Sequence, residues 1–162
     1  HHRSVLDRGP PFPVMMPLVK QMLAERSLRP EGERVRLPVE RHLFLKRRWQ
    51  GVAEDGAAFE FDLASRLKDG CVIHQTEAAD YVIAQKEETV FQIATPTAEQ
   101  AALVGWKIGN LHFPVQIFDG FIRVTTDPMI RELLGAEDWP HKEVSVVFQP
   151  LKLPPQVTSS SA

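Results

Sequence analysis

Residues 105–117 read Gly-Trp-Lys-Ile-Gly-Asn-Leu-His-Phe-Pro-Val-Gln-Ile, and they join a predicted helix to a predicted strand. Small side chains recur at helical spacing before and within this stretch, which predicts a helix over residues 97–111 with a close-packed face. That face is formed by Ala98, Ala102, Gly105 and Gly109. Pro114 prevents the helix from continuing and biases Phe113 toward an extended conformation. His112 therefore lies at the junction between helix and strand.

His112 has two interpretations when it is judged from the residues alone. Either nearby backbone groups satisfy its ring nitrogens, or its neutral imidazole binds a metal ion, since histidine is the commonest protein ligand for borderline metals. One imidazole does not hold a metal tightly, so the second interpretation needs a further copy of the chain, which a homodimer supplies through a two-fold axis. His1 and His2 are interpreted as the end of an affinity tag and are excluded as ligands.

Residues 109–117, Gly-Asn-Leu-His-Phe-Pro-Val-Gln-Ile, resemble the signature Gly-Asn-x-His-x-Pro-x-Gln-Ile of the UreE family of urease accessory proteins. The order of the predicted elements agrees with that family from about Met16 to Leu151. The resemblance implies a nickel metallochaperone in which His112 from each subunit of a homodimer lies near the two-fold axis. The two rings would bind one Ni(II) ion between them. Zn(II) and Cu(II) are expected to compete, because imidazole also suits these metals.

The resemblance also implies the partners. They are the urease apoprotein and other urease accessory proteins, among them a GTPase, to which the chain would deliver Ni(II) during maturation of the urease active site. The chain itself would not catalyse a reaction. In agreement, the sequence contains no Gly-rich phosphate loop, no His-Glu-x-x-His zinc motif and no Gly-x-Ser-x-Gly elbow.

Composition excludes several other classes of protein. The chain has 162 residues with a formal net charge of -2, which provides no electrostatic reason to expect nucleic acid or an anionic membrane as a partner. It has no apolar run of the roughly 20 residues that span a bilayer, and no signal peptide is visible. Cys71 is the only cysteine, which suits a reducing compartment. We therefore predict a cytoplasmic protein, with Cys71 as a buried, inert thiol.

The fold class predicted is α+β, with a small all-β domain followed by a ferredoxin-like one. Residues 1–15 are interpreted as tag or linker, and residues 16–88 as a β-rich domain, which the resemblance implies to bind peptides or partners. Asp55-Gly56 predicts a tight hairpin turn between strands at 49–52 and 59–63. His42 and His74 are expected to have structural roles. The basic residues of this domain are expected to be solvated, with an acidic partner as the alternative. They are Arg41, Lys46, Arg47 and Arg48.

Residues 89–150 are predicted to form the metal-binding domain, with the order β-α-β-β-α-β that characterises ferredoxin-like folds. Thr95 or Thr97 caps the first helix. Asp119-Gly120 predicts a hairpin, and Asp127-Pro128 begins a second helix that Gly135 is expected to stop. Val144, Val146 and Phe148 alternate in a final strand. Residues 151–162 are expected to be a flexible tail.

Some positions depart from the family pattern. Many members have a second histidine where this chain has Lys107, and some have histidines where it has Thr125, Thr126 and Asp127. Many also end in a histidine-rich tail, which is not present here. These departures put high-capacity nickel storage in doubt and leave His112 as the expected ligand.

Other polar residues near the motif have simpler explanations than metal binding. Lys107 is expected to be solvated, Asp127 to cap a helix, and His141 to be a surface residue of a loop. Asn110 and Gln116 either orient the imidazole or stabilise a turn.

Two other functions remain open. The first is a non-catalytic adaptor or RNA-binding module, because fold alone does not determine function. No aromatic-rich strand of the RNA-recognition type supports it. The second is a small hydrolase of the acylphosphatase kind, for which Arg123 lacks a phosphate-binding loop.

Overall fold

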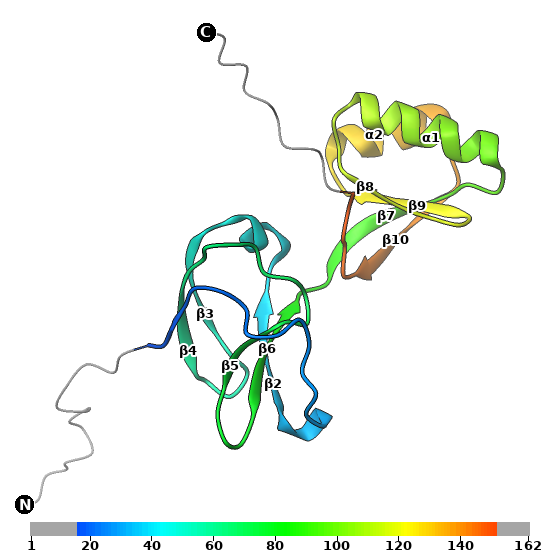
Figure 1. The fold of residues 1–162 in the computed structure, drawn as a ribbon. Helices are drawn as coiled ribbons and strands as arrows, with labels where there is room; N and C mark the ends of the chain where they lie inside the picture. Colours follow the sequence, from blue (N-terminus) through cyan, green and yellow to red (C-terminus); the bar gives the residue numbers. More distant parts are fainter. Residues whose placement is uncertain (1–15, 152–162) are drawn as a thin grey trace, which may run out of the picture. The chain divides into compact units, whose positions relative to one another are not determined.

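The computed structural model describes residues 16–151, so the predictions of a linker at 1–15 and of a tail beyond Leu151 lie outside the described residues. The described chain is α+β, with ten strands, two α-helices and two short 3-10 helices (Figure 1). It divides into two compact units, with the boundary along the chain between Lys86 and Glu87. Each unit has its own hydrophobic core. Within the described residues, no helix is long and apolar enough to cross a membrane.

The N-terminal unit is built from two three-stranded sheets. Its elements are β1 (Leu18–Val19), η2 (Glu31–Glu33), β2 (Arg34–Val39), η3 (Arg41–Leu45), β3 (Arg48–Val52), β4 (Ala58–Asp62), β5 (Val72–Gln75) and β6 (Asp80–Gln85). One sheet has the order β1-β4-β3 and the other β2-β6-β5. The predicted hairpin is confirmed, because β3 and β4 pair antiparallel and Gly56 adopts the positive φ of 91° that such a turn requires.

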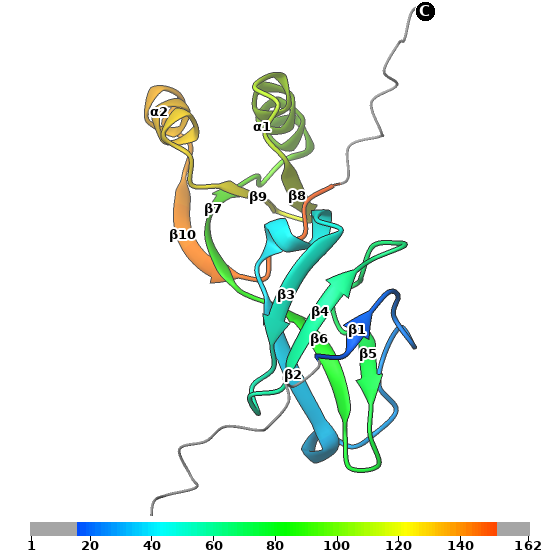
Figure 2. The ribbon, with the colours of Figure 1, turned by 90° about the vertical axis from the view of Figure 1, so that its left-hand side faces the viewer.

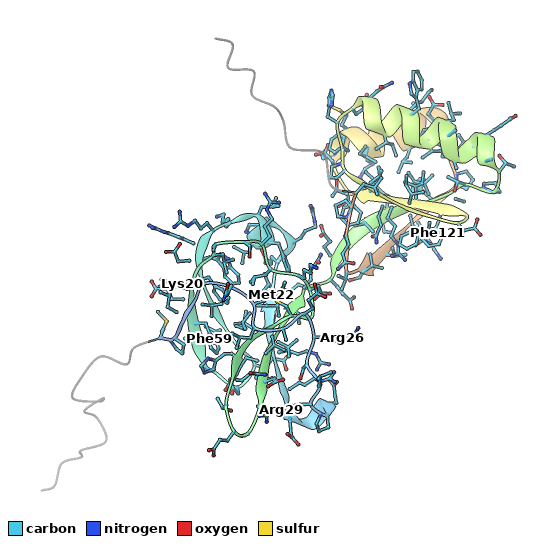
Figure 3. The ribbon with its side chains drawn as sticks, viewed as in Figure 1. Lys20, Met22, Arg26, Arg29, Phe59 and Phe121 are labelled. Carbon is cyan, nitrogen blue, oxygen red and sulfur yellow. The ribbon has the colours of Figure 1, made fainter. Side chains whose placement is uncertain are left out.

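Aromatic side chains dominate the core of this unit. Phe59 and Phe61 of β4 are buried, and Trp49 stacks on Phe61 with ring centroids 3.8 Å apart. Phe59, which is labelled in Figure 3, contacts the rings of His74 and Tyr81. These contacts support the predicted structural role of His74.

Cys71 is fully buried in the same core. Burial disfavours the thiolate and raises the pKa of this thiol. The predicted burial of this thiol is therefore confirmed.

The C-terminal unit is a four-stranded antiparallel sheet with two helices. Its elements are β7 (Glu88–Ala94), α1 (Ala98–Asn110), β8 (Val115–Phe118), β9 (Phe121–Thr125), α2 (Pro128–Glu137) and β10 (His141–Val146). The strand order is β10-β7-β9-β8, and every neighbouring pair is antiparallel. Both helices lie on the same face of the sheet (Figures 1 and 2). The core between helices and sheet contains Phe91, Val104, Ile108 and Ile130.

Local sequence signals begin both helices as predicted. The hydroxyl of Thr97 accepts a hydrogen bond from the backbone N–H of Gln100 at 3.1 Å. The carboxylate of Asp127 accepts one from the backbone N–H of Met129 at 2.8 Å. These bonds satisfy donors that the first turn of a helix leaves unpaired.

The expected end of α2 and the expected extent of β10 are wrong. α2 continues through Gly135 to Glu137 and ends at Asp138, which adopts a left-handed conformation with φ 54°. A glycine inside a helix weakens it without stopping it. β10 begins at His141 and ends at Val146, so His141 is a strand residue rather than a loop residue, and the buried Phe148 lies beyond the strand.

The close-packed face predicted for α1 is also wrong. The residues that α1 buries are Val104 and Ile108. The small residues lie to one side of them, and three of the four are exposed: Ala98, Ala102 and Gly109. A large aliphatic side chain buries more apolar area than Ala or Gly, and this difference decides which face turns toward the sheet.

Candidate metal centre

The helix α1 ends in a way that determines the backbone conformation of His112. Leu111 follows the last helical residue with φ -86°, and His112 then adopts a left-handed conformation with φ 64°. The N–H of His112 donates a hydrogen bond to the carbonyl of Gly109 at 2.9 Å, and the N–H of Leu111 donates one to Ile108 at 3.0 Å. Both bonds satisfy carbonyl groups at the end of the helix.

His112 itself is exposed, whereas the residues on either side of it are not. Leu111 and Phe113 are half-buried and pack against the core of the C-terminal unit. β8 begins two residues after Phe113, at Val115. The imidazole therefore stands on a short connection whose two neighbouring side chains are held in the core.

The ring of His112 makes no hydrogen bond, ion pair or aromatic contact with any residue between Met16 and Leu151 that the structure describes. The lone pair of a neutral imidazole at this position is accessible to a ligand. The structure therefore does not support the interpretation in which nearby backbone groups satisfy the ring nitrogens of His112.

The other polar residues near the motif have different partners. Gln116 does not orient the imidazole by a hydrogen bond, since its side-chain oxygen accepts one from the N–H of Gln149 at 3.2 Å. The ring of His141 has its Nδ1 2.8 Å from the carbonyl oxygen of Trp139. Asp127 caps α2, as predicted.

Lys107 was expected to be solvated, and that expectation is wrong. It forms an ion pair with Glu137, 30 residues later, and so links α1 to α2. Because Lys107 faces α2, the opposite side of α1 points away from α2, and the small residues lie on that side. We call this side the α1 face, and it consists of Ala98, Ala102, Gly105, Trp106 and Gly109.

The α1 face is apolar and, apart from the half-buried Gly105, exposed. Trp106 is 63% exposed and Leu103, beside it on the helix, is 39% exposed. Sequence reasoning missed both residues as surface features, because a large apolar side chain on a helix is normally expected in the core. A Cβ added at Gly109 would meet nothing within 4 Å.

The remaining histidines belong to the N-terminal unit. His42 is exposed in η3, with its Nδ1 3.4 Å from a carboxylate oxygen of Glu40. In the part of the chain that the structure describes, no group of three or more His, Cys, Asp and Glu side chains could hold a metal ion. Closed structural metal sites need about four ligands, so the described residues of one copy do not build such a site.

Comparison with known proteins finds a family match in the C-terminal unit and several relatives. Residues 88–159 match the family model described as "UreE urease accessory protein, C-terminal domain". A protein of Burkholderia lata named Urease accessory protein UreE is 30% identical over 84 residues, which cover 52% of this chain and 41% of that protein. A protein of the same name from Alcanivorax borkumensis is 27% identical over 105 residues, covering 62% of this chain and 60% of that protein.

A third relative of that name, from Beijerinckia indica, is 28% identical over 87 residues, which cover 54% of this chain and 46% of that protein. The chain thus aligns with between 41% and 60% of the length of these curated relatives. The matched region contains α1, His112 and β8. The C-terminal unit thus matches the C-terminal domain of the UreE family of urease accessory proteins.

Proposed function

We propose that this chain is a nickel-binding metallochaperone that acts as a homodimer, with His112 of each copy binding one Ni(II) ion near the two-fold axis. The observation that carries the proposal is the exposed imidazole of His112, which has no partner among the described residues and follows directly after α1. Imidazole suits Ni(II), and it also suits Zn(II) and Cu(II), which would compete for the same site.

A second copy of the chain would complete the site. Near a two-fold axis a residue meets its own symmetry mate, so one histidine per chain supplies two ligands. The α1 face offers an apolar surface for such a contact, with the exposed indole of Trp106 as its largest side chain. Few protein ligands leave other metal positions open, which favours transfer of the ion to another protein over permanent storage.

The function proposed for the whole protein is delivery of Ni(II) during urease maturation, without catalysis. The name shared by the relatives supports this proposal. The partners would be the urease apoprotein and other urease accessory proteins, among them a GTPase, and the compartment would be the cytoplasm. The buried free thiol of Cys71 agrees with a reducing compartment.

We further infer that residues 89–150 are the metal-binding domain and have the ferredoxin-like arrangement. The element order and the strand order β10-β7-β9-β8 support this inference. Residues 16–88 would then bind a partner. A pocket of about 440 Å³, formed by β1, β3 and β4 with Trp49 and Arg48 in its wall, supports this role.

The proposal is tested by calorimetric titration of Ni(II) into the protein with His1 and His2 removed, while light scattering follows the mass. We expect about one Ni(II) per dimer, with binding lost in His112→Ala. Loss of the imidazole removes both ligands of the site at once, because each copy contributes the same residue.

His141→Ala is the matched control, since His141 is also an exposed histidine of the C-terminal unit. It is expected to bind Ni(II) like the parent protein. Equal binding by His112→Ala and the parent would reject His112 as the ligand. A complete failure of the parent to bind Ni(II) would reject the metallochaperone function.

A further inference from the structure

We propose that Leu111 and Phe113 are positioning residues, which hold His112 in a backbone conformation that glycine would normally occupy and so fix the place of its imidazole. The consequence for metal binding rests on the proposed function. The conformational part can be tested in the metal-free protein.

His112 lies directly after the residue that caps the end of α1. Helices often end with a left-handed residue after the cap, and that residue is usually glycine, because a Cβ is unfavourable there. Here the cap is Leu111, and the left-handed residue is His112 with φ 64°. The hydrogen bond from the His112 N–H to the Gly109 carbonyl, at 2.9 Å, is one of the two bonds that the Schellman type of helix end makes.

The residues on either side of His112 maintain this conformation. A left-handed residue with a side chain persists only where its surroundings require it. Leu111 and Phe113 both pack against the core that contains Ile108, three residues before Leu111. An apolar contact between the residues on the two sides of such a helix end commonly accompanies it. The described contacts therefore restrain the backbone on both sides of His112.

No hydrogen bond, ion pair or aromatic contact with a described residue holds the imidazole of His112, so its position depends on the backbone of residue 112 and on its own side-chain torsions. A metal-ligating residue whose backbone is already ordered loses less conformational entropy when the metal binds. Leu111 and Phe113 would thus contribute to metal affinity without touching the metal.

The conformational claim is tested by thermal unfolding of the metal-free variants His112→Gly and His112→Ala. Glycine tolerates a positive φ and alanine does not, so we expect the midpoint of His112→Gly to be about 2 to 4 °C above that of His112→Ala. Since neither variant has an imidazole, the comparison does not depend on metal binding. A midpoint of His112→Gly that is no higher than that of His112→Ala would overturn the claim.

The positioning claim is tested with two leucines of the same core. Leu111 and Leu133 are both half-buried and pack against the same cluster, but Leu133 belongs to α2 and is not adjacent to His112 in the chain. In the metal-free protein, we expect Leu111→Ala to lower the NMR order parameter of the His112 amide and Leu133→Ala to leave it unchanged. Equal order parameters in the two variants would overturn the claim.

Ni(II) titration of the same pair connects the claim to function. We expect Leu111→Ala to raise the dissociation constant about tenfold, the lower end of what residues supporting a metal ligand contribute, while Leu133→Ala binds like the parent. Leu111→Met should restore the affinity, because methionine refills the site. An equal loss in both alanine variants would reject positioning, whereas Ni(II) binding that survives in His112→Ala would instead reject the proposed function.

Discussion

His112 is one of two residues other than glycine that have a positive φ among residues 16–151, and the second is Asp138. Each follows the end of a helix. Aspartate tolerates the left-handed conformation better than most residues, because its short polar side chain can bond to the local backbone. Histidine is also enriched in this conformation among residues other than glycine, and at His112 the half-buried Leu111 and Phe113 restrain the backbone on both sides.

A second residue-scale feature is the hydrogen bond from the Tyr81 hydroxyl to the Asp55 carboxylate, 2.6 Å long. This bond, together with one from the N–H of Ala57, lowers the pKa of Asp55 below its ordinary value of 3.8. A carboxyl group with a lowered pKa stabilises the folded state above its ordinary pKa. That contribution is lost as the pH falls through the lowered pKa.

We predict that Tyr81→Phe has a lower free energy of unfolding than the parent at pH 6, and that the difference shrinks as the pH approaches 2. Urea unfolding at a series of pH values measures it. In an Asp55→Asn background the substitution should no longer change the pH dependence. If the same pH-dependent difference persisted there, Asp55 would not be its cause.

At the scale of the element, α1 has three different sides. One packs on the sheet through Val104 and Ile108, and another faces α2 through the ion pair of Lys107 with Glu137. The α1 face is the third side and is open. A helix of this kind is stabilised mainly by the first side, since helical stability in proteins comes chiefly from packing of an apolar face.

We predict that Gly109→Ala stabilises the monomer by about 0.5 to 1 kcal/mol, because an added Cβ has open space and alanine favours the helix. Denaturant unfolding at a concentration where the protein is monomeric measures the change. Gly135→Ala in α2 is the matched control, since a Cβ there also meets nothing within 4 Å, and should give a similar gain. Destabilisation by Gly109→Ala alone would mean that the α1 face is packed within one copy.

The elements that sequence reasoning predicted well depend on neighbouring residues. Asp119-Gly120 forms a turn with Gly120 at φ 89°, and Asp127-Pro128 begins α2, because turn and cap chemistry acts over a few residues. The orientation of α1 was not predicted, since it depends on partners far away in the sequence, such as Glu137 for Lys107.

The sequence likewise predicted only the part of the candidate site that depends on neighbouring residues. The motif identified His112, and no local signal identified Leu111 and Phe113 as its supports, because apolar side chains are equally expected in any core. Glycine is the usual signal for a left-handed residue after a helix. Neither position 112 nor position 138 is a glycine, so the sequence did not predict a left-handed residue at either helix end. The end of α2 was misplaced, and the end of α1 was described incompletely.

At the scale of the whole molecule, the proposed dimer makes the α1 face an interface between copies. We predict that Ala102→Arg, in the middle of this exposed face, gives a monomer by light scattering and lowers the Ni(II) affinity. Near a two-fold axis each new arginine lies close to its own mate, so the charges repel each other.

Glu132→Arg provides the control for the new charge, because Glu132 is an exposed residue of α2. This variant should keep the mass and the Ni(II) affinity of the parent. An unchanged dimer mass in Ala102→Arg would place the interface on another surface of the chain.

The buried thiol of Cys71 has a practical consequence for studying that assembly. A fully buried thiol with a raised pKa reacts slowly with alkylating reagents. A cysteine introduced at the exposed Ala98 would therefore react first with a spin label, without replacement of Cys71. Each copy would carry one probe, and pulsed electron paramagnetic resonance would then measure a single distance across the symmetry axis.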